Sequence, residues 1–127
     1  MTPVTIPSGY QQVMPYLIVK GAAEFITFMH HVFDAEERMR HMRDEKTIMH
    51  AEVTIGECVI MLADATDAFE PRTGGFFIYV ADTDATYAKA INAAAIAISP
   101  IEDMPYGRSG GVVDPFGNTW WITSPIA

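Results

Sequence analysis

Apolar residues recur at helical spacing in one stretch of the chain. They stand at positions i, i+3, i+4, i+7 and i+8, on one stripe of a helix: Phe25, Phe28, Met29, Val32 and Phe33. A short apolar run before the stripe and three extended runs after it predict strands at 13–20, 36–42, 47–55 and 58–64. Gly56-Glu57 suits a two-residue hairpin turn between the last two strands. The first half is therefore predicted to be a strand, a helix and three strands.

The second half repeats this order. Residues 75–80 predict a strand, and Asp82, Thr83 and Asp84 can cap a helix over the alanine-rich run that follows, at 85–95. Three further strands are predicted at 96–101, 107–113 and 118–123, the last two joined by an Asp-Pro-Phe-Gly turn at 114–117. We predict a single α+β domain of two βαβββ modules, at about 13–64 and 75–124. The connecting loop, 65–74, is short for a domain linker, so we expect the modules to share a sheet.

Composition narrows the class of protein. Of 127 residues, Asp+Glu number 16 and Lys+Arg 8, giving a formal net charge of -8. The mixed run 36–46 cancels itself, so the excess of acids belongs to the rest of the chain. The electrostatic field of this excess negative charge disfavours nucleic acid as a partner and favours a cationic ligand.

The sequence shows neither a membrane span nor a signal peptide, so we expect no membrane partner. The single cysteine, Cys58, excludes a disulfide framework and indicates the cytoplasm. Cys58 falls on the apolar side of its strand and is expected to be buried.

Several short motifs occur together in a fixed order: Pro15-Tyr16-Leu17, His50-Ala51-Glu52, Met61-Leu62-Ala63-Asp64, Tyr106-Gly107-Arg108-Ser109-Gly110 and Asp114-Pro115-Phe116-Gly117. In this order and spacing the chain resembles the vicinal oxygen chelate (VOC) superfamily of glyoxalases, bleomycin-resistance proteins and extradiol dioxygenases, most closely its PhnB-like branch. The resemblance implies paired βαβββ modules curled around a concave cavity that binds a small molecule. It also implies a homodimer.

The resemblance also marks where metal-dependent members hold their metal. Those positions fall on Met14, on Ile60 or Met61, on Gly75 and on Trp121. None is His, Glu or Gln, and a thioether suits soft copper rather than the divalent ions of this family. We therefore expect a cavity without the usual metal site.

Strand pairing predicts which side chains face the cavity. A turn at Gly56-Glu57 sets Val53 against Ile60, Ala51 against Leu62 and Glu52 against Met61. The first two pairs suit the helix-covered face, so Glu52, Met61 and His50 belong to the other face. A turn at 43–46 sets Met39 against His50 and His41 against Ile48, making His41 and His50 diagonal neighbours. In the second module the same parity turns Phe77, Tyr79 and Thr119 inward with Trp121.

Two interpretations of the cavity stay open. In the first it is an adaptable pocket for a small organic molecule, cationic or aromatic, without a cofactor. Its candidate ligand-binding residues are Met14, Tyr16, Met39, Met61, Phe77, Tyr79, Arg108 and Trp121, with His50 and Glu52 as polar anchors. In the second the protein is an enzyme of the isomerase, lyase or dioxygenase type. That enzyme would use a divalent metal ion held by His41, His50 and Glu52, or acid/base catalysis by His50 and Glu52 alone.

Blander roles compete with these. His50 and Glu52 can form a plain cross-strand hydrogen bond. Arg108 either clamps an anionic group or pairs with an acid such as Glu102 or Asp103. His30 and His31 are adjacent helical residues and are expected on the surface. A third possibility is an accessory domain whose dimer surface is its function.

Overall fold

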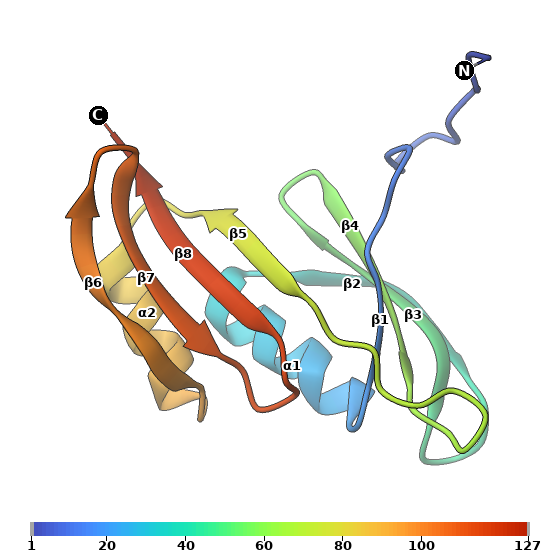
Figure 1. Cartoon of the computed structure of the whole chain (residues 1–127). Coiled ribbons are helices and arrows are strands. Elements are labelled where there is room, and N and C mark those ends of the chain that lie inside the picture. The colour runs from blue at the N-terminus through green and yellow to red at the C-terminus, as the bar shows by residue number, and fades with distance from the viewer. Residues whose placement is uncertain (1, 127) are drawn as a thin grey trace.

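The predicted order of elements is present in both halves of the chain. A computed structural model describes residues 2–126. The first module contains β1 (Tyr16–Val19), α1 (Ala22–Phe33), β2 (Glu36–Met42), β3 (Ile48–Ile55) and β4 (Cys58–Asp64). The second contains β5 (Gly75–Tyr79), α2 (Thr83–Asn92), β6 (Ile96–Met104), β7 (Gly107–Val113) and β8 (Thr119–Pro125). The α+β class and the two βαβββ modules are thus confirmed (Figure 1).

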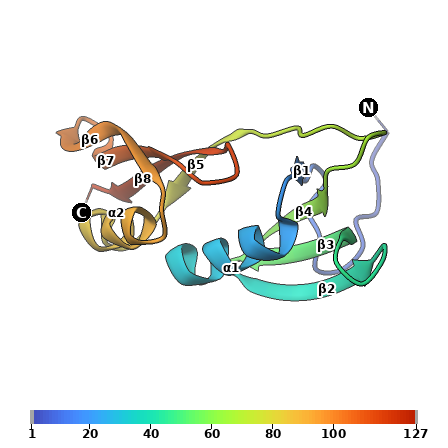
Figure 2. The ribbon, with the colours of Figure 1, turned by 90° about the horizontal axis from the view of Figure 1, so that it is seen from below.

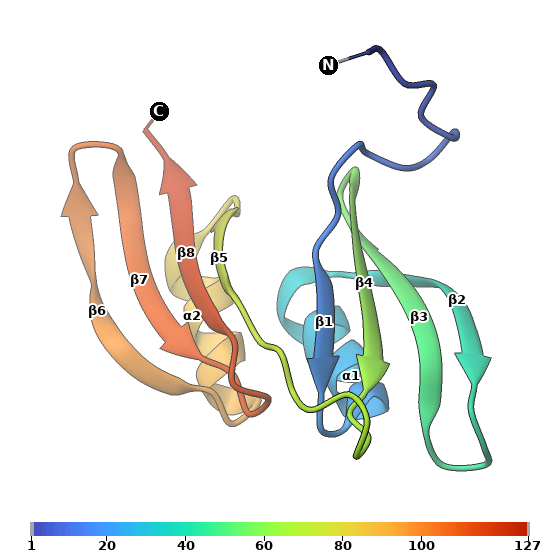
Figure 3. The same ribbon diagram turned by 45° about the vertical axis from the view of Figure 1, so that its right-hand side comes forward.

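The two modules do not share one sheet, and that expectation was wrong. The strand orders are β1-β4-β3-β2 and β5-β8-β7-β6, with β1 parallel to β4 and β5 parallel to β8. β1 and β5 are the edge strands of the two sheets that lie toward the other module, and they do not pair with each other (Figure 3). The connecting loop occupies part of the free edge of β1, because Arg72 bonds both backbone groups of Ile18, at 3.0 and 2.8 Å.

A helix covers one face of each sheet. The predicted stripe of α1 is buried, and it packs over Ala51, Val53 and Leu62 of the first sheet. α1 also reaches the second module, because the ring of Phe33 lies 4.5 Å from that of Trp120. The two helices lie side by side in the angle between the sheets (Figure 2). One core therefore joins both modules. Within residues 2–126, no helix has the length and apolar character needed to span a membrane.

The end of β4 fixes the start of α1. The buried carboxylate of Asp64 accepts hydrogen bonds from the backbone N–H groups of Gly21 (3.2 Å), Ala22 (2.8 Å) and Ile48 (2.6 Å). An acid at this place satisfies donors that a helix cannot pair and favours the positive end of its dipole. In the second module Asp82 caps α2 by accepting from Ala85 N–H at 3.1 Å, as the sequence predicts.

The predicted turn at 114–117 is present and carries a buried acid. Asp114 accepts hydrogen bonds from the N–H groups of Phe116 (2.8 Å) and Asn118 (2.9 Å) and from the indole of Trp120 (2.8 Å). Gly117 has a φ of 95°, a conformation that suits glycine. The turn therefore anchors the largest core side chain of the second module.

Candidate functional site

Each sheet has one face without a helix, here called its bare face. On the first sheet, strand alternation and register place a mixed polar and apolar group there: Tyr16, Met39, His50, Glu52 and Met61. The predicted pairing of Glu52 with Met61 is confirmed. Met14, next to β1, is half-buried.

From Met39 to His41, the pairing of β2 with β3 differs from the prediction by two residues. Met39 opposes Glu52, and His41 opposes His50. Two irregularities in β2, between Glu37 and Met39 and between His41 and Met42, shift the register. Because strand side chains alternate with a period of two, this shift leaves the predicted faces unchanged.

Glu52 is a buried carboxylate at the centre of the first bare face. It is 3% exposed. The Tyr10 hydroxyl donates a hydrogen bond to its Oε1 at 2.8 Å, and His50 Nε2 lies 2.8 Å from its Oε2. Burial raises the pKa of Glu52, but the hydrogen bonds from His50 and Tyr10 and the charge of Arg38 lower it more, leaving the pKa below its ordinary value. Glu52 is therefore ionised at neutral pH.

Tyr16 extends this network toward solvent. Its hydroxyl lies 2.9 Å from His50 Nδ1, and the two rings are 5.4 Å apart. An ionised carboxylate only accepts hydrogen bonds, so His50 Nε2 carries a hydrogen and, in the neutral ring, Nδ1 accepts from Tyr16. Burial raises the pKa of Tyr16, so its hydroxyl keeps its proton at neutral pH. The result is a hydrogen-bonded chain from Tyr16 through His50 to Glu52.

Residues near the start of the chain complete this face, and sequence reasoning missed them. Gln11 makes two hydrogen bonds with the backbone of Val59, at 2.9 and 3.2 Å. Arg38 donates to the Gly9 carbonyl at 2.7 Å and stacks 4.4 Å above the Tyr10 ring. The segment before β1 has no strand or helix periodicity, so no pattern in the sequence announces these contacts.

The bare face of the second sheet carries exposed aromatic side chains. The predicted residues Phe77, Tyr79 and Trp121 are 50%, 62% and 39% exposed. Tyr106, which the sequence analysis names only as part of a motif and not as a candidate ligand-binding residue, joins them at 49% exposure. The Phe77 ring lies 5.2 Å from Tyr79 and 5.9 Å from Tyr106. We call these four residues the aromatic cluster. Gly111 lies directly beneath Trp121, where an added Cβ would collide with the indole.

Arg108 lies apart from both bare faces. It donates to Asp84, in the first turn of α2, at 3.1 Å and to Asp103 at 3.0 Å. These bonds raise the pKa of the guanidinium further. The salt-bridge interpretation of Arg108 therefore matches the structure. Its side chain lies on the side of β7 that α2 covers. His30 and His31 are exposed, as predicted.

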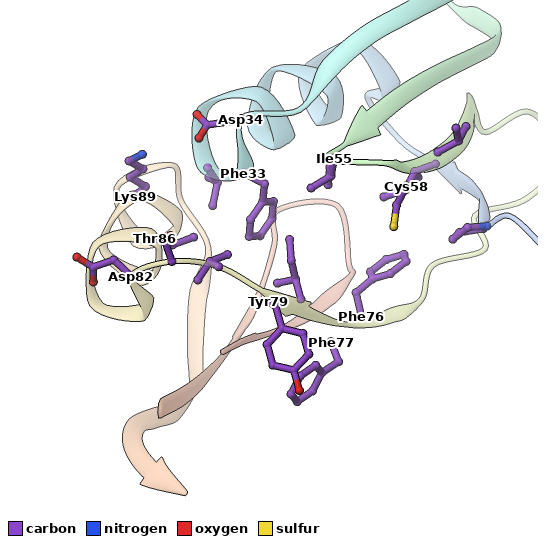
Figure 4. A pocket seen from close by; sticks show the side chains of 18 of the residues that line it. Phe33, Asp34, Ile55, Cys58, Phe76, Phe77, Tyr79, Asp82, Thr86 and Lys89 are labelled. Atoms are coloured by element: carbon purple, nitrogen blue, oxygen red, sulfur yellow. The ribbon is translucent and has the colours of Figure 1, made fainter. Parts of the chain in front are cut away.

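A cavity of about 810 Å³ lies between the modules, alongside β5. Phe33, Ile55, Cys58 and Phe76 point into it (Figure 4). Phe77 and Tyr79 also border the cavity, but their rings project toward the opposite side of β5. Tyr16, His50 and Glu52 do not line it. Cys58 is exposed, so the expected burial was wrong: it stands at the start of β4, where the strand borders this cavity.

The two bare faces of one chain lie side by side with both helices behind them (Figure 3). They do not face one another, so the polar face of the first sheet and the aromatic cluster do not enclose a space within one chain.

The alternative metal set does not converge. Within residues 2–126, no group of three or more His, Cys, Asp or Glu side chains is placed to hold a metal ion, and His41 is exposed. The positions that hold metal in the resembling family also lack suitable donors, because Gly75 and Trp121 offer no ligand atom. The chemistry that the site does offer is hydrogen bonding and proton transfer by Tyr16, His50 and Glu52, together with aromatic stacking.

Comparison with known proteins agrees with the fold and the doubled architecture. Residues 9–122 match the family model of the Glyoxalase/Bleomycin resistance protein/Dioxygenase superfamily, and the chain belongs to this superfamily. It is 32% identical over 124 residues to an uncharacterized protein of Mycobacterium bovis, covering 88% of this chain and 82% of that protein. An uncharacterized protein of Mycobacterium tuberculosis is also 32% identical, with 73% of its length covered.

Solved structures show the same fold. The PhnB protein of Bacillus cereus, described as a putative 3-demethylubiquinone-9 3-methyltransferase, superposes with a TM-score of 0.76 at 20% identity, covering 90% of this chain and 99% of that one. TioX from a Micromonospora species gives 0.74 at 20% identity, covering 91% and 99%. The fosfomycin resistance protein FosX of Mesorhizobium loti gives 0.66 at 17% identity, covering 91% and 92%. At these identities the likeness concerns the fold alone.

Proposed function

We propose that this protein binds a small, flat, aromatic molecule through the aromatic cluster, without the metal site of its superfamily. The observation that carries the proposal is the exposure of Phe77, Tyr79, Tyr106 and Trp121 together on one sheet face. Soluble proteins seldom leave such a group uncovered unless it binds something. Aromatic rings stack on planar ligands, and the glycine beneath Trp121 leaves the indole room to lie flat against the sheet. The net charge of -8 favours a cationic ligand.

The proposed ligand site includes two copies of the chain. The bare faces of one chain lie side by side, so a ligand stacked on the aromatic cluster stays open to solvent on its other side (Figure 3). A second copy that places its first module beside this cluster would cover the ligand with Tyr16 and Met61. The inner edge strand β5 and the exposed aromatic cluster suit such an arrangement, because edge strands and exposed apolar side chains both favour a partner.

The names of structural neighbours agree with this direction. FosX is named a fosfomycin resistance protein, so the fold is compatible with a function directed at a small molecule. An apolar binding face suits the sequestration of a small compound better than it suits a metal-dependent reaction.

Fluorescence titration tests the proposal. Proflavine, a flat aromatic cation, is expected to bind the wild-type protein and to quench tryptophan emission. Trp121→Ala should weaken binding at least about tenfold, equivalent to about 1.4 kcal/mol. Phe69→Ala is the matched control, because Phe69 is an exposed (63%) phenylalanine outside the bare faces. Equal affinities in all three proteins would contradict the proposed site, as would the absence of binding across a wider panel of cationic and neutral aromatics.

A second candidate function is acid/base catalysis. The contact that favours it is the hydrogen bond between His50 and the buried carboxylate of Glu52. The metal-dependent form of this alternative is tested by metal analysis of protein purified without chelators. Stoichiometric metal that disappears in His50→Ala would support it.

A further inference from the structure

Three side chains on the bare face of the first sheet connect solvent to a buried charge. Tyr16 is 46% exposed, His50 is half-buried, and Glu52 is 3% exposed. The contacts between them are short, 2.9 Å from the Tyr16 hydroxyl to His50 Nδ1 and 2.8 Å from His50 Nε2 to Glu52 Oε2. Both ring nitrogens of His50 are therefore engaged: Nδ1 contacts Tyr16 on the solvent side, and Nε2 contacts Glu52 on the interior side.

The hydrogen bonds from Tyr16 to His50 and from His50 to Glu52 run in the direction that activates a hydroxyl group, here that of Tyr16. Glu52 accepts the hydrogen of Nε2, which orients the imidazole and leaves Nδ1 as the base. Nδ1 accepts the hydrogen of the Tyr16 hydroxyl. A hydroxyl held by a base that a carboxylate orients is the general signature of an activated nucleophile or acid/base group. A plain surface hydrogen bond between Tyr and His would not need a buried carboxylate behind it.

The carboxylate is held independently of the histidine. Tyr10 donates to Glu52 Oε1 at 2.8 Å, and Arg38 Nε lies 3.7 Å from the same oxygen. Both oxygens of Glu52 are thus engaged, which fixes the carboxylate and keeps it charged. The other charged or titratable groups facing the network are Arg43, whose charge acts on Tyr16, and His41, which opposes His50 across the β2–β3 ladder.

We propose that Tyr16, His50 and Glu52 form a proton relay, in which the Tyr16 hydroxyl is the catalytic group that exchanges a proton with a molecule bound on this face. The proposal rests on the proposed function, since it needs a ligand beside the first module. His50 is the base behind Tyr16, and Glu52 is a positioning residue. Suitable ligands carry an acidic hydrogen, such as a carbonyl compound with hydrogen on the adjacent carbon.

The proton balance of the step is simple. The Tyr16 oxygen takes a proton from the ligand while its own proton passes to His50 Nδ1. The ligand becomes its conjugate base, and His50 becomes an imidazolium that the charge of Glu52 stabilises. Return of the proton by the same path restores the protein, so no oxidant, reductant or metal is needed.

Site-selective acetylation tests whether His50 removes the Tyr16 proton. In the reaction with p-nitrophenyl acetate, the Tyr16 oxygen bonds to the acyl carbon, the bond to p-nitrophenolate breaks, and the tyrosine proton passes to His50. Peptide mass spectrometry measures the rate for each tyrosine. We expect Tyr16 to react at least about tenfold faster than Tyr79, although Tyr79 is more exposed. Equal or slower reaction at Tyr16 would overturn the relay.

Variants separate the relay from a structural role. His50→Gln should reduce the Tyr16 rate to that of Tyr79, and Phe69→Ala should leave it unchanged. Glu52→Gln should reduce the Tyr16 rate, because an amide neither fixes the hydrogen on Nε2 nor stabilises the positive charge that His50 gains when it takes the tyrosine proton, and Glu52→Asp should restore part of the rate. An unchanged Tyr16 rate in a folded Glu52→Gln variant, checked by circular dichroism, would contradict the role of Glu52.

Nitrogen-15 NMR of the free protein gives a second measurement that needs no ligand and no variant. The relay requires the hydrogen on Nε2 of neutral His50, and a hydrogen on Nδ1 would overturn it. Failure of the relay and failure of the proposed function are distinguishable. If the protein does not bind proflavine but Tyr16 still reacts faster than Tyr79, the ligand site alone is refuted. If the protein binds proflavine but Tyr16 reacts no faster than Tyr79, the relay alone is refuted.

Discussion

Replacement of Asp64 by alanine is expected to destabilise the protein strongly. The carboxylate accepts three backbone hydrogen bonds, from Gly21, Ala22 and Ile48, and is 8% exposed. Two of these donors begin α1 and the third begins β3. In Asp64→Ala all three lose their acceptor in a place that water reaches poorly.

The magnitude follows from the cost of leaving buried donors unpaired. Each such group costs about 1–3 kcal/mol, so if a water molecule enters the gap and rebonds one donor, the two donors left unpaired cost about 2–6 kcal/mol. That is a large share of the roughly 5–15 kcal/mol by which a domain is stable. With a urea m-value of about 1.5 kcal/mol/M, the unfolding midpoint should fall by about 1.3 M or more.

Asp82→Ala provides the matched control. Asp82 also caps a helix, but it is exposed and accepts one bond, from Ala85. Its loss should reduce the free energy of unfolding by only about 1 kcal/mol. Urea unfolding followed by circular dichroism measures both variants. If Asp64→Ala cost no more than Asp82→Ala, the reasoning that ties stability to the three buried donors would be refuted.

Three further outcomes are expected. Asp114→Ala leaves the Trp120 indole N–H unpaired in the core and should reduce the free energy of unfolding by about 2–4 kcal/mol in urea melts, whereas a loss below about 1 kcal/mol would contradict the anchoring role of this turn. The folded-state pKa of Glu52 is lowered, so the stability that its ionisation contributes is complete above the ordinary pKa and is lost as pH falls through the folded-state value. Urea melts across that acidic range should therefore show wild type losing stability relative to Glu52→Gln, and a constant difference would argue against it. Cys58 borders an open cavity, so one thiol per chain should titrate with a disulfide reagent before unfolding, and reaction only in urea would contradict its exposure.

Most of the fold could be predicted from local periodicity in the sequence. The stripe on α1 and the register between β3 and β4 were predictable because helical spacing and a two-residue turn are properties of adjacent residues. From Met39 to His41 the predicted register between β2 and β3 was wrong by two residues, because irregularities in a charged, exposed strand leave no hydrophobic pattern in the sequence. The separation into two sheets was not predictable, because it involves contacts between distant segments, such as that of Arg72 in the connecting loop with Ile18 of β1.

The site was predicted only in part, for similar reasons. His50 and Glu52 follow from the pairing of β3, whose apolar face is evident. For Arg108 the sequence left both a ligand-binding role and a salt bridge open, because β7 is rich in glycine and alternation of apolar residues does not reveal which side of the strand the arginine occupies. Tyr10 contacts Glu52 from 42 residues away across an irregular segment, a contact that only the folded chain defines.

A mixing experiment tests the two-chain ligand site most directly. Tyr16→Ala impairs the first module and Trp121→Ala the second, so each protein alone should bind proflavine weakly. If a site combines the first module of one copy with the second module of the other, a mixed dimer contains one intact site. Refolding the two variants together should then restore about a quarter of the wild-type sites. A mixture that binds no better than either variant alone would contradict the account.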